Sequence, residues 1–340
     1  MLAGPRGREL CARLAGIDVE GRYPQSSAVP FVADPAGEVG QWPVVGEEAV
    51  GQIEEPTLVA ADPRHELFGI RELAEVTESA GYWGGYPSGA DPLDDPALRP
   101  AMREAAARLA GAEGCRWWWS GIDRSAQTSV QWTARDAPAP VLGQAAAMLR
   151  DVDLQDDERE KSSKRYLHRR AGKGPQGEWW TYPCPGVMST TRGVARLGAL
   201  LLAGQEDGFG DVEAVVWPLA VAENARIFEV DSPGAWQALV SAYPRHATAS
   251  YRHTWAWTGW NGDWLAPHWS AVARDWDGVH LTVAAYLSTA GSPLPIGTAR
   301  TLLGGWNPDQ TYWLTDVLTD VGHAQPWHTD GGDPLGWTAG

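Results

Sequence analysis

The chain has 340 residues, of which 44% are hydrophobic and 21% charged, a composition typical of a globular protein rather than a disordered one. It carries 27 Lys and Arg against 43 Asp and Glu, which gives a formal net charge of -16. This excess of acidic residues excludes a generally basic nucleic-acid binder, although a local basic segment remains compatible with it.

Cysteine usage and hydropathy indicate the compartment. The three cysteines, Cys11, Cys115 and Cys184, are odd in number and form no CxxC pair, which favours a reduced, intracellular protein. The first residues carry charges where a signal peptide needs an apolar stretch. The longest apolar run, at 197–203, is far shorter than the roughly 20 residues of a membrane helix. We therefore expect a cytoplasmic protein without a membrane span.

Residues 1–135 are predicted to form an α+β part that is mainly helical at its start. A short helix near the N-terminus is followed by Gly- and Pro-rich chain. Apolar residues at nearly helical spacing then predict two helices, near 67–73 and 98–109. The segments CRWWWS and AQTSVQWT, which a GIDRS turn separates, predict two strands.

Residues 136–174 are predicted to be a linker and a basic connector helix. Within 158–173, seven Lys and Arg face two Glu, a local charge of +5, so the remaining chain carries -21. All three lysines of the protein lie here, and Tyr166 and His168 stand among the cations, as in an RNA-binding segment. The seven candidate tRNA-binding residues are Arg159, Lys161, Lys164, Arg165, Arg169, Arg170 and Lys173. The alternative is a solvated helix face paired with acidic neighbours.

Residues 175–322 are predicted to form a mixed α/β part, followed by a polar tail over 323–340. EWWTYP, VMSTTRG, VEAVVWPL and ARIFEV predict strands. Ser232 and Pro233 predict a helix start, and Pro244 its end. A second helix is expected over 277–290, and TLLGGW and TYWLTDV are expected to pair as a hairpin around an NPDQ turn.

The predicted fold class is therefore α/β (mixed α+β), with a mixed sheet, flanking helices, a helical N-terminal part and a Trp-rich core. The chain has 20 tryptophans and only 4 phenylalanines. Indole rings suit a buried core, and they also suit a pocket wall that stacks on a planar or cationic ligand. Both interpretations remain open at this point.

Two pairs of residues are candidates for acid–base chemistry. Glu229 and Asp231 are two apart, so they project to one face at the carboxyl end of a predicted strand, where clefts of α/β folds open. Asp277 and His280 are three apart at a predicted helix start, where the carboxylate could orient the imidazole as a general base. The alternatives are structural: helix capping, an ion pair with an arginine, and a satisfied core histidine.

Polar residues around STTRG are candidates for substrate binding. Ser189, Thr190 and Arg192 could hold a phosphate or carboxylate, and Tyr182 of EWWTYP is a further candidate contact. The sequence contains no Walker loop, no GxGxxG after a predicted strand, no HExxH or GxSxG motif and no standard zinc spacing. We therefore predict no metal and no cofactor.

Two resemblances to known families extend these predictions. MLAGPRGRELC, DWDGVHLTVAAYLSTAG and GGWNPDQTYWLTDV are similar to a family of actinomycete proteins related to the valanimycin-type aminoacyl-tRNA-dependent transferase, which moves a seryl group onto a hydroxylamine. That resemblance implies specialised metabolism, such as antibiotic biosynthesis, and acyl transfer from a tRNA ester. VMSTTRG and ARIFEVDSPG resemble core strands of ADP-ribosyltransferases, but no ExE or QxE turn of that family follows shortly downstream.

The leading functional hypothesis is a transferase that moves an aminoacyl group from a charged tRNA to a small molecule bearing a hydroxyl or an amine. His280 would be the base, Asp277 would orient it, and the connector cations would bind the tRNA. The alternatives are an NAD-using enzyme of the ADP-ribosyltransferase kind and a non-catalytic, Trp-lined protein that binds a small molecule or a partner. The oligomeric state is left open.

Overall fold

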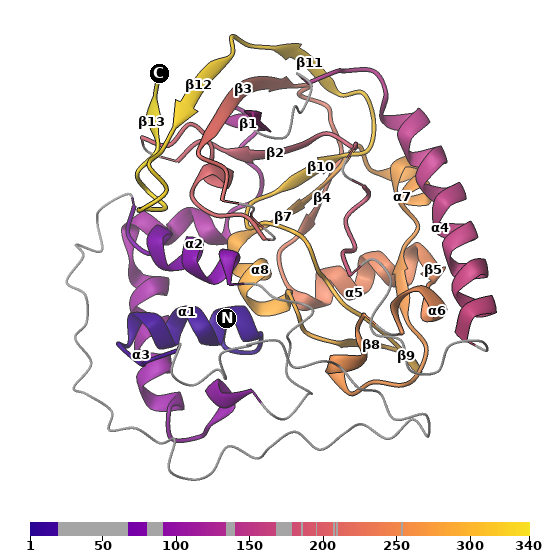
Figure 1. The fold of residues 1–340 in the computed structure, drawn as a ribbon, viewed down its shortest axis with the longest axis horizontal. Helices are drawn as coiled ribbons and strands as arrows, with labels where there is room; N and C mark the ends of the chain where they lie inside the picture. Colours follow the sequence, from indigo (N-terminus) through magenta and orange to yellow (C-terminus); the bar gives the residue numbers. More distant parts are fainter. Residues whose placement is uncertain are drawn as a thin grey trace.

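The structure is a computed structural model. It describes residues 1–19, 67–79, 91–133, 140–167, 179–184, 186–194, 196–206, 208, 210–252 and 254–340. The sheet fills the upper half of the molecule in Figure 1, the N-terminal helices lie at the lower left, and α4 runs along the right-hand flank. The fold is the mixed α+β arrangement that the sequence predicts, with a mixed sheet and Trp-rich clusters.

The described helices flank this sheet. They are α1 Pro5–Leu14, α2 Ile70–Glu78, α3 Arg99–Gly111, α4 Ala145–Leu167, α5 Pro233–Ala242, α6 Thr248–Tyr251, α7 Trp269–Asp275 and α8 Val283–Thr289. Short 3-10 helices occur at Pro92–Asp94, Glu113–Trp119 (η4), Leu200–Leu202 and Ala256–Thr258. No described helix is at once long and apolar enough to span a membrane.

The main sheet has nine strands and is almost wholly antiparallel. Its order is β13–β12–β3–β1–β2–β10–β7–β4, with β11 also paired to β3, and only β4 and β7 are parallel. The strands are β1 Gln127–Trp132, β2 Ser189–Arg192, β3 Glu213–Val221, β4 Ile227–Val230, β7 Gly278–Leu281, β10 Thr311–Trp313, β11 Leu318–Val321, β12 Gln325–His328 and β13 Thr338–Ala339.

Two small two-stranded antiparallel sheets lie below the main sheet in Figure 1. β5 Pro244–His246 pairs with β6 Leu265–Pro267, and β8 Leu294–Ile296 pairs with β9 Ala299–Thr301. Beside them, Trp255 and Trp264 are fully buried, and Tyr251 stacks on Trp255 with ring centroids 3.8 Å apart. The larger core contains buried residues from described segments between Leu10 of α1 and Trp337 near the C-terminus.

Several predicted elements agree with the structure. β2 and β4 lie within VMSTTRG and ARIFEV, β3 covers most of VEAVVWPL and continues to Val221, and the helices predicted near 67–73 and 98–109 are present as α2 and α3. Ser232 caps α5, because its hydroxyl accepts a hydrogen bond from the amide of Ala235, and Pro233 occupies the first turn. Pro244 follows the end of that helix, as predicted.

The predicted helix over 277–290 is wrong, because its first half is a strand. Val279, His280 and Leu281 belong to β7, which β4 and β10 flank, and the helix α8 begins only after the capping hydroxyl of Thr282. Every residue of β7 is buried. A strand covered on both faces has the same continuous apolar pattern as a buried helix, so periodicity could not separate them.

Two predicted strands are wrong because packing decides their conformation. CRWWWS forms η4, in which the ring of Trp118 is fully buried and lies close to Gly69. EWWTYP is not a strand over its described residues 179–183, where the amide of Thr181 instead bonds the carbonyl of Gly304 and Trp180 stacks on Tyr182. The preference of aromatic residues for strands reflects their packing rather than their backbone.

The predicted C-terminal hairpin and tail are also wrong. TLLGGW and TYWLTDV do not pair with each other, because β9 pairs with β8, and β10 lies between β2 and β7. The last residues extend the sheet as β12 and β13, and the rings of Trp327 and Trp337 are buried. The burial of these two rings holds the otherwise polar segment against the rest of the protein.

Candidate functional site

Register across four strands brings predicted site residues together. Glu229 of β4 is paired with His280 of β7, His280 with Thr311 of β10, and Thr311 with Thr190 of β2. Side chains directly opposite one another in a sheet share a face. The sheet therefore carries a polar row through its interior, although the strands themselves are largely apolar.

His280 lies at the centre of this row and is completely buried. Its Nδ1 is 2.6 Å from Oε2 of Glu229, and its Nε2 is 3.3 Å from Oδ1 of Asp309. Burial lowers the pKa of the imidazolium, but the hydrogen bonds to Asp309 and Glu229 outweigh that effect and raise the pKa to about 8. At neutral pH His280 is therefore a cation held between two carboxylates.

Asp309 joins His280 to Arg192. Its Oδ1 accepts a 2.8 Å hydrogen bond from Nε of Arg192, and its Oδ2 accepts a 3.0 Å bond from the backbone amide of the same residue. The φ of Asp309 is +59°, the left-handed region that Asp and Asn enter more readily than other side chains. The NPDQ turn therefore aims a carboxylate back into the sheet.

Glu229 is the end of the network that reaches solvent. Its side chain is 33% exposed, compared with 10% for Arg192, 2% for Asp309 and 0% for His280. We name these four residues, Glu229, His280, Asp309 and Arg192, the charge relay. Two carboxylates, one imidazolium and one guanidinium offset one another, which is the condition for burying charge at tolerable cost.

The loop after η4 closes over both ends of the charge relay. The amide of Ile122 donates a 3.0 Å hydrogen bond to Glu229, and the carbonyl of Gly121 accepts one of 3.1 Å from Arg192. The guanidinium of Arg192 also lies 4.7 Å from the ring centroid of Trp117, a cation–π contact. A Cβ at Gly121 would lie 2.8 Å from the carboxylate of Glu229, so a larger residue here would displace that carboxylate from its present position.

Asp277 is not the orienting partner of His280, which corrects the sequence prediction. Because β7 is a strand, residues three apart face opposite sides of the sheet. Asp277 instead accepts hydrogen bonds from the guanidinium of Arg226 and the hydroxyl of Thr315. The bonds from Arg226 lower the pKa of Asp277 to about 2, against the opposing effect of burial.

Asp231 lies just beyond β4 and is exposed, and its carboxylate accepts a hydrogen bond from the hydroxyl of Ser232. Of the predicted carboxylate pair, Glu229 belongs to the charge relay and Asp231 does not.

The other predicted substrate-binding residues make hydrogen bonds and ring contacts within the protein. The hydroxyl of Thr190 donates to Gln127 and accepts a hydrogen bond from Trp313, and the hydroxyl of Ser189 accepts one from Gln310. Tyr182 stacks on Tyr312 with ring centroids 5.4 Å apart. The four predicted substrate-binding residues therefore separate: Arg192 belongs to the charge relay, and the other three support the sheet around it.

Two acidic residues of α4, Asp156 and Glu160, face the protein, whereas Asp151, Asp157 and Glu158 are exposed. Asp156 is 3.0 Å from Arg245, and Glu160 accepts hydrogen bonds from the backbone amides of Ala249 and Ser250. Both carboxylates are buried, on the same helix face as Leu149 and Val152.

The described connector cations lie further from the core. Lys164 and Arg165 are 63% and 69% exposed and pair with acids of their own helix, Glu160 and Glu158, while Arg159 pairs with Asp156. Lys161 is exposed. His168, Arg169, Arg170 and Lys173 lie outside the described residues.

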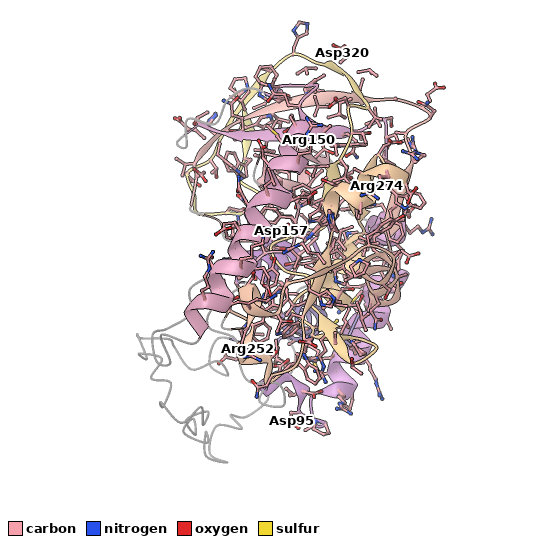
Figure 2. All side chains as sticks on the ribbon, turned by 90° about the vertical axis from the view of Figure 1, so that its right-hand side faces the viewer. Asp95, Arg150, Asp157, Arg252, Arg274 and Asp320 are labelled. Carbon is pink, nitrogen blue, oxygen red and sulfur yellow. The ribbon has the colours of Figure 1, made fainter. Side chains whose placement is uncertain are left out.

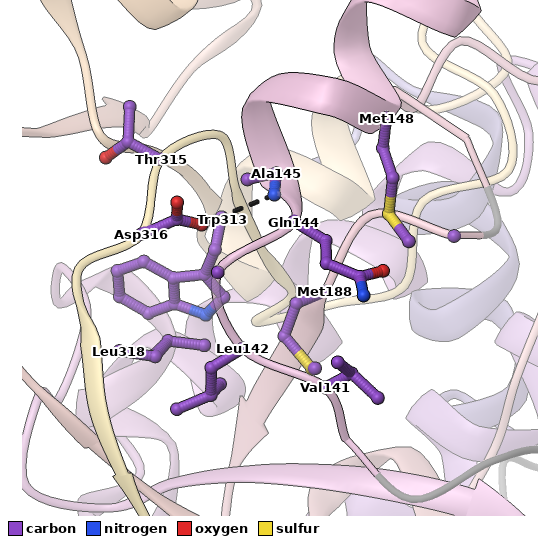
Figure 3. A pocket seen from close by; sticks show the side chains of 12 residues that line it. Val141, Leu142, Gln144, Ala145, Met148, Met188, Trp313, Thr315, Asp316 and Leu318 are labelled. Carbon is purple, nitrogen blue, oxygen red and sulfur yellow. Dashed lines mark hydrogen bonds between the residues drawn. The ribbon is translucent and has the colours of Figure 1, made fainter.

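A small pocket lies where α4 begins, between that helix and the turn after β10 (Figure 3). Its volume is about 20 Å³, room for about one water molecule. Met148, Met188 and Trp313 line it, and Asp316 accepts a hydrogen bond from the amide of Ala145 at its rim. None of the charge-relay residues lines it, so it is not a candidate substrate site.

The sequence alone could not reveal Asp309, nor the loop residues Gly121 and Ile122. The signal for Asp309 was the NPDQ turn, whose residue types allow a left-handed Asp, but nothing in the sequence placed that turn beside β7. Among the described residues, no group of three His, Cys, Asp or Glu is arranged to hold a metal ion.

Comparisons with known proteins give no match, whether to family models, to curated proteins or to solved structures. The resemblances described under the sequence analysis remain predictions.

Proposed function

We propose that this protein is an enzyme whose charge relay performs general acid–base chemistry, with Glu229 as the group that meets the substrate. The observation that carries the proposal is a fully buried imidazole between two carboxylates, of which only Glu229 reaches solvent. A base must lie within hydrogen-bond reach of the proton that it removes, and of the four residues Glu229 is the most exposed.

The proton path follows from the contacts. Glu229 removes a proton from a hydroxyl or amine, and its Oε2 lies 2.6 Å from Nδ1 of His280, close enough to pass that proton inward. His280 accepts it only when the imidazole is neutral. Asp309, which Arg192 anchors, then stabilises the imidazolium that forms.

We further propose that the reaction is transfer of an aminoacyl group from a charged tRNA to a small acceptor. The acceptor oxygen or nitrogen bonds to the acyl carbon, the acyl–oxygen bond to the tRNA breaks, and the 3′-oxygen regains a proton. Support for the tRNA donor comes from the end of α4, where residues 161–165 carry the exposed cations Lys161, Lys164 and Arg165 and no acid. The exposed acids Asp157 and Glu158 lie earlier in the helix. An exposed cationic helix end suits a phosphate backbone.

The catalytic proposal is tested with Glu229→Gln, which keeps the shape of the side chain and removes its basicity. The assay follows transfer of a labelled aminoacyl group from charged tRNA to hydroxylamine, with the uncatalysed rate subtracted. We expect a loss of about 100-fold or more in kcat and a rate for the parent protein that rises with pH through about 8. Glu223→Gln, at an exposed glutamate of the turn before β4, is the matched control.

A folded Glu229→Gln variant that keeps the parent rate would refute the role of Glu229. Absence of transfer by the parent protein would refute the tRNA donor. Turnover of NAD by the parent protein would favour the ADP-ribosyltransferase alternative, and binding without any turnover would favour a non-catalytic protein.

The tRNA donor has a separate binding test. Charge reversal to Glu at Lys161, Arg165, Arg169 and Arg170 should weaken tRNA binding and reduce its dependence on salt. The control is the same reversal at four arginines of α3 and η4, namely Arg99, Arg103, Arg108 and Arg116. Equal tRNA affinity of the two variants would contradict the proposed binding face.

A further inference from the structure

A second cavity lies where α4 approaches α6, away from the charge relay. Its volume is about 280 Å³, close to the lower end of the range for small-molecule sites, about 300 Å³. Figure 2 shows Arg252 beside the lower end of α4 in that view. The cavity is lined by Glu160, Lys164, His246, Thr248, Ala249, Arg252 and Asp263.

Two of the lining charges already offset each other. Glu160 accepts hydrogen bonds from the amides of Ala249 and Ser250 and from the hydroxyl of Ser250, and Nζ of Lys164 lies 3.4 Å from it. Burial alone would raise the pKa of Glu160, but these hydrogen bonds lower it below its usual value. Glu160 is therefore charged and largely satisfied by the protein.

Arg252 and Asp263 are different, because each charge lacks a charged partner. Within the described chain, Arg252 makes no side-chain hydrogen bond or ion pair, and the carboxylate of Asp263 accepts only a 3.2 Å hydrogen bond from the hydroxyl of Thr248. No ion pair joins the two, although they line one cavity. Both residues are exposed, so a negative and a positive group are accessible to a ligand at this cavity.

The wall that carries Asp263 is held in place. The backbone carbonyl of Asp263 accepts hydrogen bonds from the indole of Trp260 and the amide of Arg300. The hydroxyl of Thr248, which donates to the carboxylate of Asp263, also accepts a hydrogen bond from the amide of Trp264. Trp264 is fully buried in the aromatic cluster. A carboxylate fixed in this way requires little ordering when a ligand binds.

We propose that this cavity binds a small zwitterion of the α-amino-acid class, with the ammonium at Asp263 and the carboxylate at Arg252. Only a ligand that carries both signs compensates both residues, since an anion alone would face Asp263 and a cation alone would face Arg252. The volume admits an amino acid and is small for a nucleotide. This proposal does not rest on the function proposed for Glu229.

The test compares three related ligands by ligand-observed NMR on the full chain: L-alanine, ethylamine and propionate. Ethylamine lacks the carboxylate of alanine, and propionate lacks its ammonium. We expect L-alanine to bind about tenfold or more tightly than either. Arg252→Gln and Asp263→Asn should each abolish that advantage, whereas Arg116→Gln and Asp94→Asn, at exposed residues elsewhere, should preserve it.

Asp263→Asn keeps an acceptor for Thr248, so the variant should fold, as circular dichroism would verify. Propionate or inorganic phosphate binding as tightly as L-alanine would overturn the proposal in favour of an anion site. No saturable binding of L-alanine, or binding that both cavity variants retain, would also overturn it.

Discussion

At the scale of single residues, the proton on His280 depends on the whole charge relay. Its pKa is about 8 in the folded chain and 6.5 without partners, so folding favours the protonated form. The resulting stabilisation is complete below about pH 6.5 and is lost as the pH rises through about 8. It amounts to about 2 kcal/mol.

We therefore predict that the free energy of unfolding falls by about 2 kcal/mol in total as the pH rises from well below 6.5 to well above 8, as measured by urea denaturation. His280→Gln cannot bind the proton, so this part of the pH dependence should disappear. His323→Gln, at an exposed histidine, is the control and should retain it. A parent protein whose stability does not change between about pH 6.5 and 8 would show that His280 is neutral in the folded chain.

The sequence identified three members of the charge relay but not their connections. Glu229, His280 and Arg192 stand out as polar residues within apolar or β-branched segments. Their partners depend on strand order, and β7 lies between β4 and β10 although these strands are far apart in the chain. Spacing along the chain therefore suggested Asp277 as the partner of His280, whereas register across the sheet supplies Glu229.

At the scale of elements, the sequence predicted those helices and strands whose signals lie within a few neighbouring residues. The Ser232–Pro233 start of α5 follows from capping chemistry within four residues, and β3 follows from its β-branched run. The long-range elements were not predictable in this way. β12 pairs with β3, more than a hundred residues earlier in the chain, and is anchored by a ring that fits over Gly198.

That anchoring leads to a prediction for the C-terminal strands. Trp327 is 7% exposed, and its indole lies against Gly198, where a Cβ would approach it to 2.6 Å. Trp327→Ala should destabilise the protein by about 3–5 kcal/mol, because the cavity it leaves cannot fully collapse. Trp119→Ala, at a ring 44% exposed, should cost much less.

Urea unfolding of both variants, followed by circular dichroism, would measure the difference. Equal stability of Trp327→Ala and the parent protein would mean that residues 323–340 behave as the tail that the sequence suggested.

At the scale of the whole molecule, one hydrophobic core contains residues from parts of the chain that the sequence analysis treated as separate. Leu10 of α1, Met102 of α3, Val279 of β7 and Trp337 belong to the same buried cluster. Segments that share a core lose it together, so we expect a single cooperative transition.

The prediction is that tryptophan emission and far-UV circular dichroism report the same urea midpoint. Leu10→Ala, at a fully buried residue of α1, should lower both midpoints equally and cost about 2–5 kcal/mol. Arg99→Ala, at an exposed residue of α3, is the control. A tryptophan midpoint that stays at the parent value while the circular-dichroism midpoint falls would show that the N-terminal helices unfold separately.

The left-handed backbone of Asp309 restricts how this sequence can diverge. Only Asp, Asn or Gly fits that conformation readily, and of these only Asp balances the charges of Arg192 and His280. A change at any one of the four positions leaves an uncompensated buried charge, so tolerated changes must occur in matched sets. Among homologous sequences, positions 192, 229, 280 and 309 should therefore covary as a unit, either keeping all four ionisable residues or replacing them together.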